Sequence, residues 1–101
     1  MSQLVVITNN LMDASRVQSV VPDAVVARSL HDDALAGADV ILLDLISGID
    51  PADVAAIGPP VVAYGPHVDS DALDAAIAAG CRDALPRSRL FRRLPDLLDR
   101  T

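Results

Sequence analysis

The chain has 101 residues, of which 51% are hydrophobic, and only Tyr64 and Phe91 are aromatic. This length and composition predict one compact domain with an aliphatic core and exclude a disordered chain. Fourteen aspartates oppose eight arginines, with no glutamate or lysine, and the net charge of −6 disfavours binding to a phosphate backbone. No secretory signal is visible, and no apolar run approaches the roughly 18 residues of a membrane span. We therefore expect a cytoplasmic protein that binds neither nucleic acid nor a membrane.

Short aliphatic runs without apolar and polar alternation are typical of strands buried on both faces, as in a parallel sheet. The sequence has such runs at residues 4–8, 24–28, 40–43 and 61–64, and a fifth strand is expected at residues 83–86. Helical spacing appears between them at residues 11–21, 31–38, 52–57 and 70–79, and in a last segment after residue 88. The first helix rests on the spacing of Leu11, Ser15 and Val17. Because strands and helices alternate, we expect a doubly wound α/β sheet with its ligands at the carboxyl ends of the strands.

Several residues mark the expected ends of these helices. Asp50 followed by Pro51 is typical of an N-cap with proline in the first helical position, and Gly80 is typical of a helix stop. Ser88 is expected to cap the last helix, and Pro95 is expected to interrupt it.

The third strand and its exit read Asp39-Val-Ile-Leu-Leu-Asp44-Leu-Ile-Ser-Gly48-Ile-Asp50. This segment resembles the part of bacterial response-regulator receiver (CheY-like) domains that carries the phosphoacceptor aspartate, and Asp44 matches that aspartate. The resemblance continues in order through residues 60–67, 72–80 and 84–88, so it spans essentially the whole chain. It implies a single receiver-like domain over residues 1–101, with the flavodoxin-like fold, five parallel strands in the order 2-1-3-4-5 and helices on both faces. The second and third helices are expected to be short.

The sequence departs from the receiver pattern where a receiver holds Mg²⁺ and the phosphoryl group. The two acidic residues that end the first strand of a receiver match Asn9 and Asn10 here, and amides in place of two carboxylates weaken a magnesium site. The position of the receiver's Thr or Ser after the fourth strand matches Gly65, which has no hydroxyl. Asp44 is therefore a phosphoacceptor equivalent that we do not expect to be phosphorylated.

Two further positions of the resemblance lie in and after the fifth strand. The receiver's switch aromatic matches Ala84, and its lysine matches Arg87, whose planar guanidinium does not replace lysine conservatively. Because the carboxyl ends of the strands converge, we expect Arg87 to lie within salt-bridge range of Asp44 and to fill the space of a phosphoryl group.

The resemblance and its departures together predict a pseudo-receiver, a signalling or protein-interaction module that is not an enzyme and needs no cofactor. One alternative is a phosphorylatable single-domain response regulator that uses Asp44. Another is a binder of a small ligand or anion at the strand ends, through Asn9, Asn10, Asp44 and Arg87. Phosphate uptake separates the first two readings.

The partner is expected to be another protein, or a second copy of the chain. Receivers commonly associate through the face that corresponds here to residues 70–79, 83–86 and 89–100. This face carries opposite charges at its two ends: Asp71 and Asp74 on one side, and Arg89, Arg92 and Arg93 on the other. Two copies related by a twofold axis could exchange these acidic and basic patches.

Other reactive residues suit simpler roles. His67, at a strand end, has no serine or cysteine nucleophile beside it, so it is interpreted as a loop residue rather than a catalytic one. Neither residues 31–33 nor His67 with Asp69 and Asp71 complete a metal site, and these aspartates serve equally well as helix caps. Cys81, the one cysteine, is expected to be a small packing residue.

Overall fold

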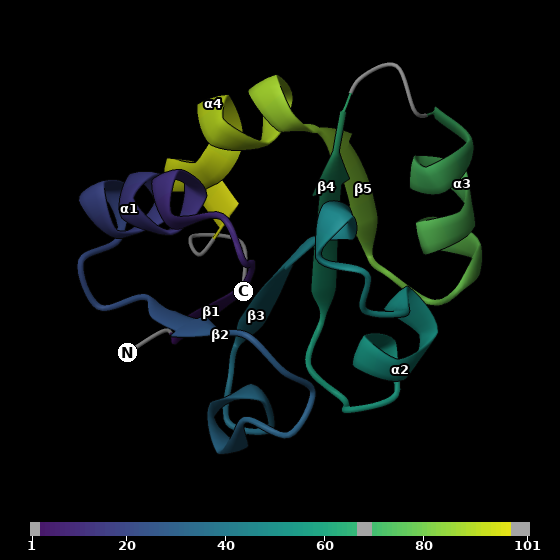
Figure 1. Ribbon diagram of the computed structural model, residues 1–101, viewed down its shortest axis with the longest axis horizontal. Coiled ribbons are helices and arrows are strands. Elements are labelled where there is room, and N and C mark those ends of the chain that lie inside the picture. The colour runs from purple at the N-terminus through teal and green to yellow at the C-terminus, as the bar shows by residue number, and fades with distance from the viewer. Residues whose placement is uncertain (1–2, 67–69, 98–101) are drawn as a thin grey trace.

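Five parallel strands form one sheet in the computed structural model, which describes residues 3–66 and 70–97 (Figure 1). The strands are β1 (Leu4–Ile7), β2 (Val25–Ala27), β3 (Val40–Asp44), β4 (Val61–Gly65) and β5 (Asp83–Pro86). They lie in the order β2-β1-β3-β4-β5, and every neighbouring pair is parallel. The doubly wound architecture and the strand order expected from the sequence are confirmed.

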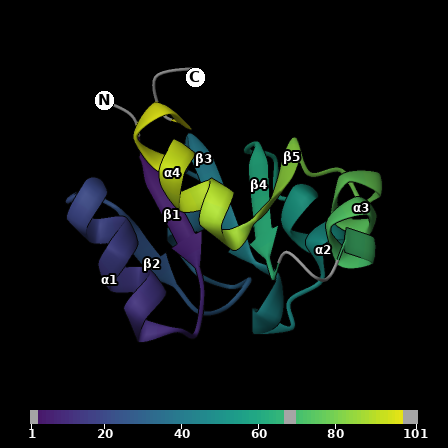
Figure 2. The same ribbon diagram turned by 90° about the horizontal axis from the view of Figure 1, so that it is seen from above.

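Helices cover both faces of this sheet. They are α1 (Leu11–Val20), α2 (Pro51–Ala55), α3 (Ser70–Ala78) and α4 (Arg87–Leu97), with 3-10 turns η1 (Asp33–Leu35) and η2 (Leu45–Ser47). Figure 2 shows α1 and α4 on one side of the sheet, here called the α1/α4 face, and α2 and α3 on the other, the α2/α3 face. The segment at residues 31–38 forms only the single turn η1, and α2 has five residues, so the short second and third helices are confirmed. No helix of the described residues is long and apolar enough to cross a bilayer.

Each face of the sheet buries its own apolar cluster, because alternate side chains of the central strands point to opposite sides. On the α1/α4 face the strands contribute Leu4, Val6, Val40, Leu42, Val62 and Leu85, which pack with Val17 of α1 and with Leu90, Phe91 and Leu94 of α4. On the α2/α3 face they contribute Val5, Ile7, Ile41, Leu43, Val61 and Ala63, which pack with Leu35, Val54, Ala76 and Cys81. Cys81 is a buried packing residue, as expected.

The helix ends agree with the sequence in two places and differ in two others. Asp50 caps α2 through the amide of Ala52, and Gly80 follows α3 with a φ of 115°, as expected. The last helix begins at Arg87, directly after β5, so Ser88 lies inside its first turn instead of capping it. The helix also continues through Pro95, because the fully buried Leu94 holds this turn against the sheet and outweighs the loss of one backbone hydrogen bond.

Candidate functional site

Three polar side chains meet where β1, β3 and β4 end. Thr8 follows β1, Asp44 is the last residue of β3, and Tyr64 lies beside Asp44 in the register of β3 with β4. Alternation along the strands turns all three to the α1/α4 face. Thr8, Asp44 and Asp13 of α1 are the buried polar or charged residues of the described chain, with exposed fractions of 1%, 5% and 0%. This end of the sheet is therefore polar, although the rest of its core is aliphatic.

The Asp44 carboxylate is held by two hydrogen bonds. The Thr8 hydroxyl donates to one oxygen at 2.8 Å, and the amide of Ile46 donates to the other at 3.0 Å. The second bond makes Asp44 the N-cap of η2. The Thr8 oxygen in turn accepts the amide of Asn10 at 3.0 Å. Asp44 is therefore a buried, oriented carboxylate with both oxygens engaged.

A second carboxylate, Asp13, pairs with the arginine of this site. Both Nη atoms of Arg87 donate to the Asp13 oxygens, and the Tyr64 hydroxyl lies 3.2 Å from Asp13 Oδ2. The hydrogen bond to Asp13 raises the pKa of Arg87 above its usual value. Burial raises the pKa of Tyr64, and the negative charge of Asp44 adds to this. Asp13 therefore joins α1, β4 and α4 through one fully buried side chain.

The expected pairing of Arg87 with Asp44 is wrong. Among the described residues no ion pair joins these two side chains, and the Arg87 guanidinium is taken by Asp13 instead. The reason is positional: Asp13 lies on the buried side of α1, where α1 meets the start of α4, and Asp44 already has two other donors.

Asn9 and Asn10 lie at the same strand ends as Asp44. Together with Asp44, Ile46, Ser47 and Arg87 they line a pocket of about 280 Å³. The Asn10 side chain is also the N-cap of α1, since its oxygen accepts the amides of Met12 at 2.9 Å and Asp13 at 3.2 Å. The structure thus brings together four of the residues that the sequence assigned to the site.

The two remaining positions lie apart from the pocket lining. Gly65 is buried at the end of β4, where an added Cβ would lie 3.5 Å from Leu45 Cδ1, an ordinary contact that leaves room for a Cβ. Ala84 is half-buried and packs with the cluster of the α2/α3 face, so it faces away from Tyr64 and Asp44.

Solved structures resemble this chain over its whole length, whereas no family model and no curated protein matches it. The receiver domain of the Francisella response regulator 1452 aligns with a TM-score of 0.72 and 18% identity, covering 99% of this chain and 98% of that one. A CheY-like protein (tadZ) from Pseudomonas aeruginosa PAO1 gives a TM-score of 0.76 at 22% identity, covering 99% and 98%. A putative pilus assembly protein (cpaE) from Burkholderia thailandensis E264 gives 0.71 at 20% identity, covering 99% and 97%. This chain has the receiver-domain fold.

The Mg²⁺ that a receiver uses does not fit the groups at these strand ends. A hard cation of this kind is bound through carboxylate oxygens and water. Both oxygens of Asp44 accept protein hydrogen bonds, Asp13 is neutralised by Arg87, and Asn9 and Asn10 bring no charge. Among residues 3–66 and 70–97 no three His, Cys, Asp or Glu side chains are grouped so that they could hold a metal ion.

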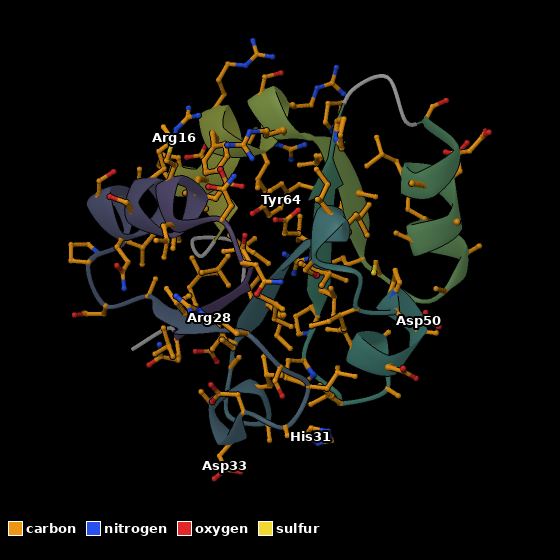
Figure 3. The ribbon with its side chains drawn as sticks, in the orientation of Figure 1. Arg16, Arg28, His31, Asp33, Asp50 and Tyr64 are labelled. Atoms are coloured by element: carbon orange, nitrogen blue, oxygen red, sulfur yellow. The ribbon has the colours of Figure 1, made fainter. Side chains whose placement is uncertain are left out.

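The other candidate ligands lie elsewhere in the receiver fold. Figure 3 shows His31 and Asp33 at the lower edge of the view, away from Tyr64 in the interior. Asp32 caps the turn η1 through the amide of Ala34. His67 and Asp69 fall outside the described residues, so their interpretation stays a prediction.

The charged residues of the expected interaction face are mostly exposed. Asp71 and Asp74 lie on α3, and Arg89 and Arg92 lie on α4, all open to solvent. Arg93 is partly engaged, because its guanidinium lies 4.0 Å from Asp83 of β5. The acidic and basic groups belong to opposite faces of the sheet and are separated by the edge strand β5 (Figure 2).

Sequence reasoning missed Thr8, Asp13 and Tyr64. Strand alternation could have found Thr8, since it has the parity of Leu4 and Val6 and follows them on the α1/α4 face. Helical spacing could have found Asp13, because it lies four residues before the buried Val17. A charged residue on the buried stripe of a helix is the signal that was overlooked.

Proposed function

We propose that this chain is a pseudo-receiver, a non-catalytic signalling module of the two-component type that acts by binding another protein and does not run a magnesium-dependent phosphorylation cycle. The observation that carries the proposal is the pairing of Arg87 with Asp13. The guanidinium that matches the lysine of a receiver forms its ion pair with an internal carboxylate and not with Asp44.

Phosphoryl transfer to a carboxylate depends on cations that stabilise the equatorial oxygens of the transferring group and on precise positioning. Here the Arg87 charge is shared with Asp13, Asn9 and Asn10 contribute no charge, and Gly65 offers no hydroxyl. Both oxygens of Asp44 also accept hydrogen bonds within the protein, from Thr8 and from the amide of Ile46. These features support a site that does not accept a phosphoryl group.

Intact-mass analysis after incubation with acetyl phosphate and Mg²⁺ tests the proposal, with Asp44→Asn as the control. We expect no added phosphoryl mass in either protein. A substantial singly phosphorylated population in the wild type, absent from Asp44→Asn, would favour the phosphorylatable response regulator.

Partial reconstruction of a receiver site sharpens this test. The substitutions Asn9→Asp and Asn10→Asp add the missing charges, and Gly65→Thr adds a hydroxyl at a position that has room for a Cβ. We expect the triple variant to bind Mg²⁺ measurably, by calorimetry, where the wild type does not. If it binds none, the match of these residues to the receiver pattern is wrong.

The partner surface that we propose is the face made by α3, β5 and α4, with either another protein or a second copy of this chain. Its support is the opposed charge of the exposed Asp71 and Asp74 against Arg89 and Arg92. Light scattering should show that Arg92→Asp with Arg93→Asp removes any dimer, whereas Arg28→Asp, an exposed arginine beyond β2, leaves it. An unchanged dimer in the reversed variant would exclude this face.

A further inference from the structure

The Asp13 carboxylate lies in an unusual setting for an acidic side chain. It is fully buried, although it belongs to the first turn of a helix whose neighbouring Leu11 and Met12 are 69% and 78% exposed. A buried charge is expensive unless it is paired and hydrogen-bonded. Asp13 is both, through the two Nη atoms of Arg87 and the Tyr64 hydroxyl. We call Asp13, Tyr64 and Arg87 the clamp.

The clamp is reinforced by contacts between α1 and α4. The guanidinium of Arg16, from α1, lies 4.1 Å from the centre of the Phe91 ring of α4, and that of Arg87 lies 5.4 Å from it. Tyr64 packs edge-on against the same ring, with the ring centres 5.9 Å apart. Figure 3 shows Arg16 where α1 approaches α4, and Tyr64 in the interior near α4. Both guanidiniums therefore pack against Phe91, one from α1 and one from the start of α4.

Arg87 also reaches the polar pocket at the strand ends. Its side chain is 37% exposed, and it lines that pocket together with Asn9, Asn10 and Ser47. These groups offer amide, hydroxyl and guanidinium donors, which suit a small oxyanion. The Asp44 carboxylate also lines the pocket and opposes an anion, but both of its oxygens accept hydrogen bonds, from Thr8 and from the amide of Ile46. While both Nη atoms are bonded to Asp13, the end-on edge of the guanidinium is occupied and its charge is compensated, so only its remaining N–H groups face an external anion.

We propose that Asp13 is an internal counter-ion that occupies Arg87 in place of an external anion, keeps the strand-end pocket closed to oxyanions and holds α1 against α4. The proposal deepens the pseudo-receiver function, on which it rests, by naming the device that withholds Arg87. Removal of the Asp13 charge frees Arg87, since its side chain already has access to solvent on the pocket side.

The test is a titration with inorganic phosphate, without magnesium, followed by the NMR amide signals of Asn9, Asn10 and Ser47. The wild type should show no saturable shift. Asp13→Asn should show a saturable shift, with an affinity at least about ten-fold above the upper limit that the wild-type titration sets. The added substitution Arg87→Met should abolish the gain. Asp53→Asn is the matched control, because Asp53 also lies three residues after an N-cap but is exposed.

An Asp13→Asn variant with the same phosphate affinity as the wild type would overturn the proposal, and so would a gain that survives Arg87→Met. If Asp13→Asn does not fold, the NMR signals of the Arg87 guanidinium in the wild type test the proposal instead. The clamp predicts slow rotation of its guanidinium, with separate Nη signals that phosphate does not change. A single averaged signal that shifts with phosphate would contradict it.

These outcomes are distinguishable from failure of the proposed function. Phosphorylation of Asp44 by acetyl phosphate and Mg²⁺, with the Arg87 signals unchanged, would overturn the pseudo-receiver function and leave the clamp intact. Phosphate binding by the wild type through Arg87, with no phosphorylation of Asp44, would overturn the clamp alone.

Discussion

The two faces of the sheet are built from the same strands but end differently. On the α2/α3 face the buried side chains of the described residues are apolar throughout. The α1/α4 face has an apolar cluster of similar size, yet its carboxyl end holds Thr8, Asp13 and Asp44, which are buried together with the Tyr64 hydroxyl. At this end of one face, hydrogen bonds and an ion pair add to apolar packing in fixing how the side chains are arranged.

The two faces should also respond differently to substitution. Removing methyl groups from a buried apolar side chain lowers the free energy of unfolding, because transfer energy is lost and a cavity is left. This holds for either side chain of an apolar contact. Breaking a buried ion pair is asymmetric, because its cost depends on which charge is left without a partner. In the clamp Asp13 is fully buried and Arg87 is 37% exposed, so the two single substitutions are not equivalent.

Arg87→Met should therefore have the largest effect. It leaves the Asp13 carboxylate buried with only the Tyr64 hydroxyl as a side-chain partner, and we expect a loss of about 3–5 kcal/mol in the free energy of unfolding, measured with urea. Asp13→Asn should cost clearly less, because the freed guanidinium can turn to solvent. Combining the two substitutions should restore part of the loss. Equal costs for both single variants would mean that the pair is effectively solvated.

On the α2/α3 face, Leu43→Ala should cost about 2–4 kcal/mol by the same measurement. Leu43 is fully buried in β3, one residue before Asp44, and its side chain points away from the clamp. The clamp should stay intact, so the NMR signals of the Arg87 guanidinium should not change. A change there would show that the two faces are coupled through β3 and are not independent.

Much of the fold could be predicted from the sequence because strand and helix patterns are local. Strands and a helix start could be predicted without any knowledge of side-chain contacts, from the aliphatic runs around Val5, Ile41 and Val62 and from the cap at Asp50. Their order along the chain predicts the topology. The α1 helix shows the limit. Leu11 belongs to its apolar spacing but is 69% exposed, whereas Asp13 is buried.

The partner of Arg87 could not be predicted for the same reason. Asp13 and Arg87 are 74 residues apart in the chain, so the helical spacing that indicates burial of Asp13 does not identify its partner. Asp44 was the natural choice because parallel strands bring their carboxyl ends together. The choice between two carboxylates near one guanidinium depends on how α1 packs on α4, which is a tertiary property.

Tyr64→Phe should lower the free energy of unfolding by about 1.5 kcal/mol, since it removes a hydrogen bond to the Asp13 carboxylate but leaves the ion pair of Arg87 with Asp13. It should also flatten the alkaline loss of stability. Burial raises the pKa of Tyr64 above its ordinary value of 10, so above that pH the unfolded chain releases a proton that the folded chain retains. The stability contributed by this group is complete below pH 10 and falls as pH rises further, by at most about 1.4 kcal/mol per pH unit.

Urea unfolding at increasing alkaline pH measures this difference. Cys81, whose pKa is also raised by burial, is present in both proteins and cancels in the comparison. As the chain has one tyrosine and no tryptophan, ultraviolet absorbance follows the ionisation of Tyr64 directly. If wild type and Tyr64→Phe lose stability in parallel above pH 10, the hydroxyl is accessible to solvent and does not belong to the clamp.

The smallest expected effects come from the two helix caps, one on each face. Asp50→Ala removes the acceptor of the Ala52 amide at 2.9 Å and should lower the free energy of unfolding by about 1 kcal/mol, with no change at the strand ends.

Asn10→Ala should lower the free energy of unfolding by a similar amount, since Asn10 caps the amides of Met12 and Asp13. It should additionally loosen the clamp, because one of those amides belongs to the residue that holds Arg87. Hydrogen exchange at α1 and the Arg87 signals separate the two variants: both should change in Asn10→Ala and neither in Asp50→Ala. An unchanged Arg87 in Asn10→Ala would show that the buried ion pair fixes the start of α1 without help from its cap.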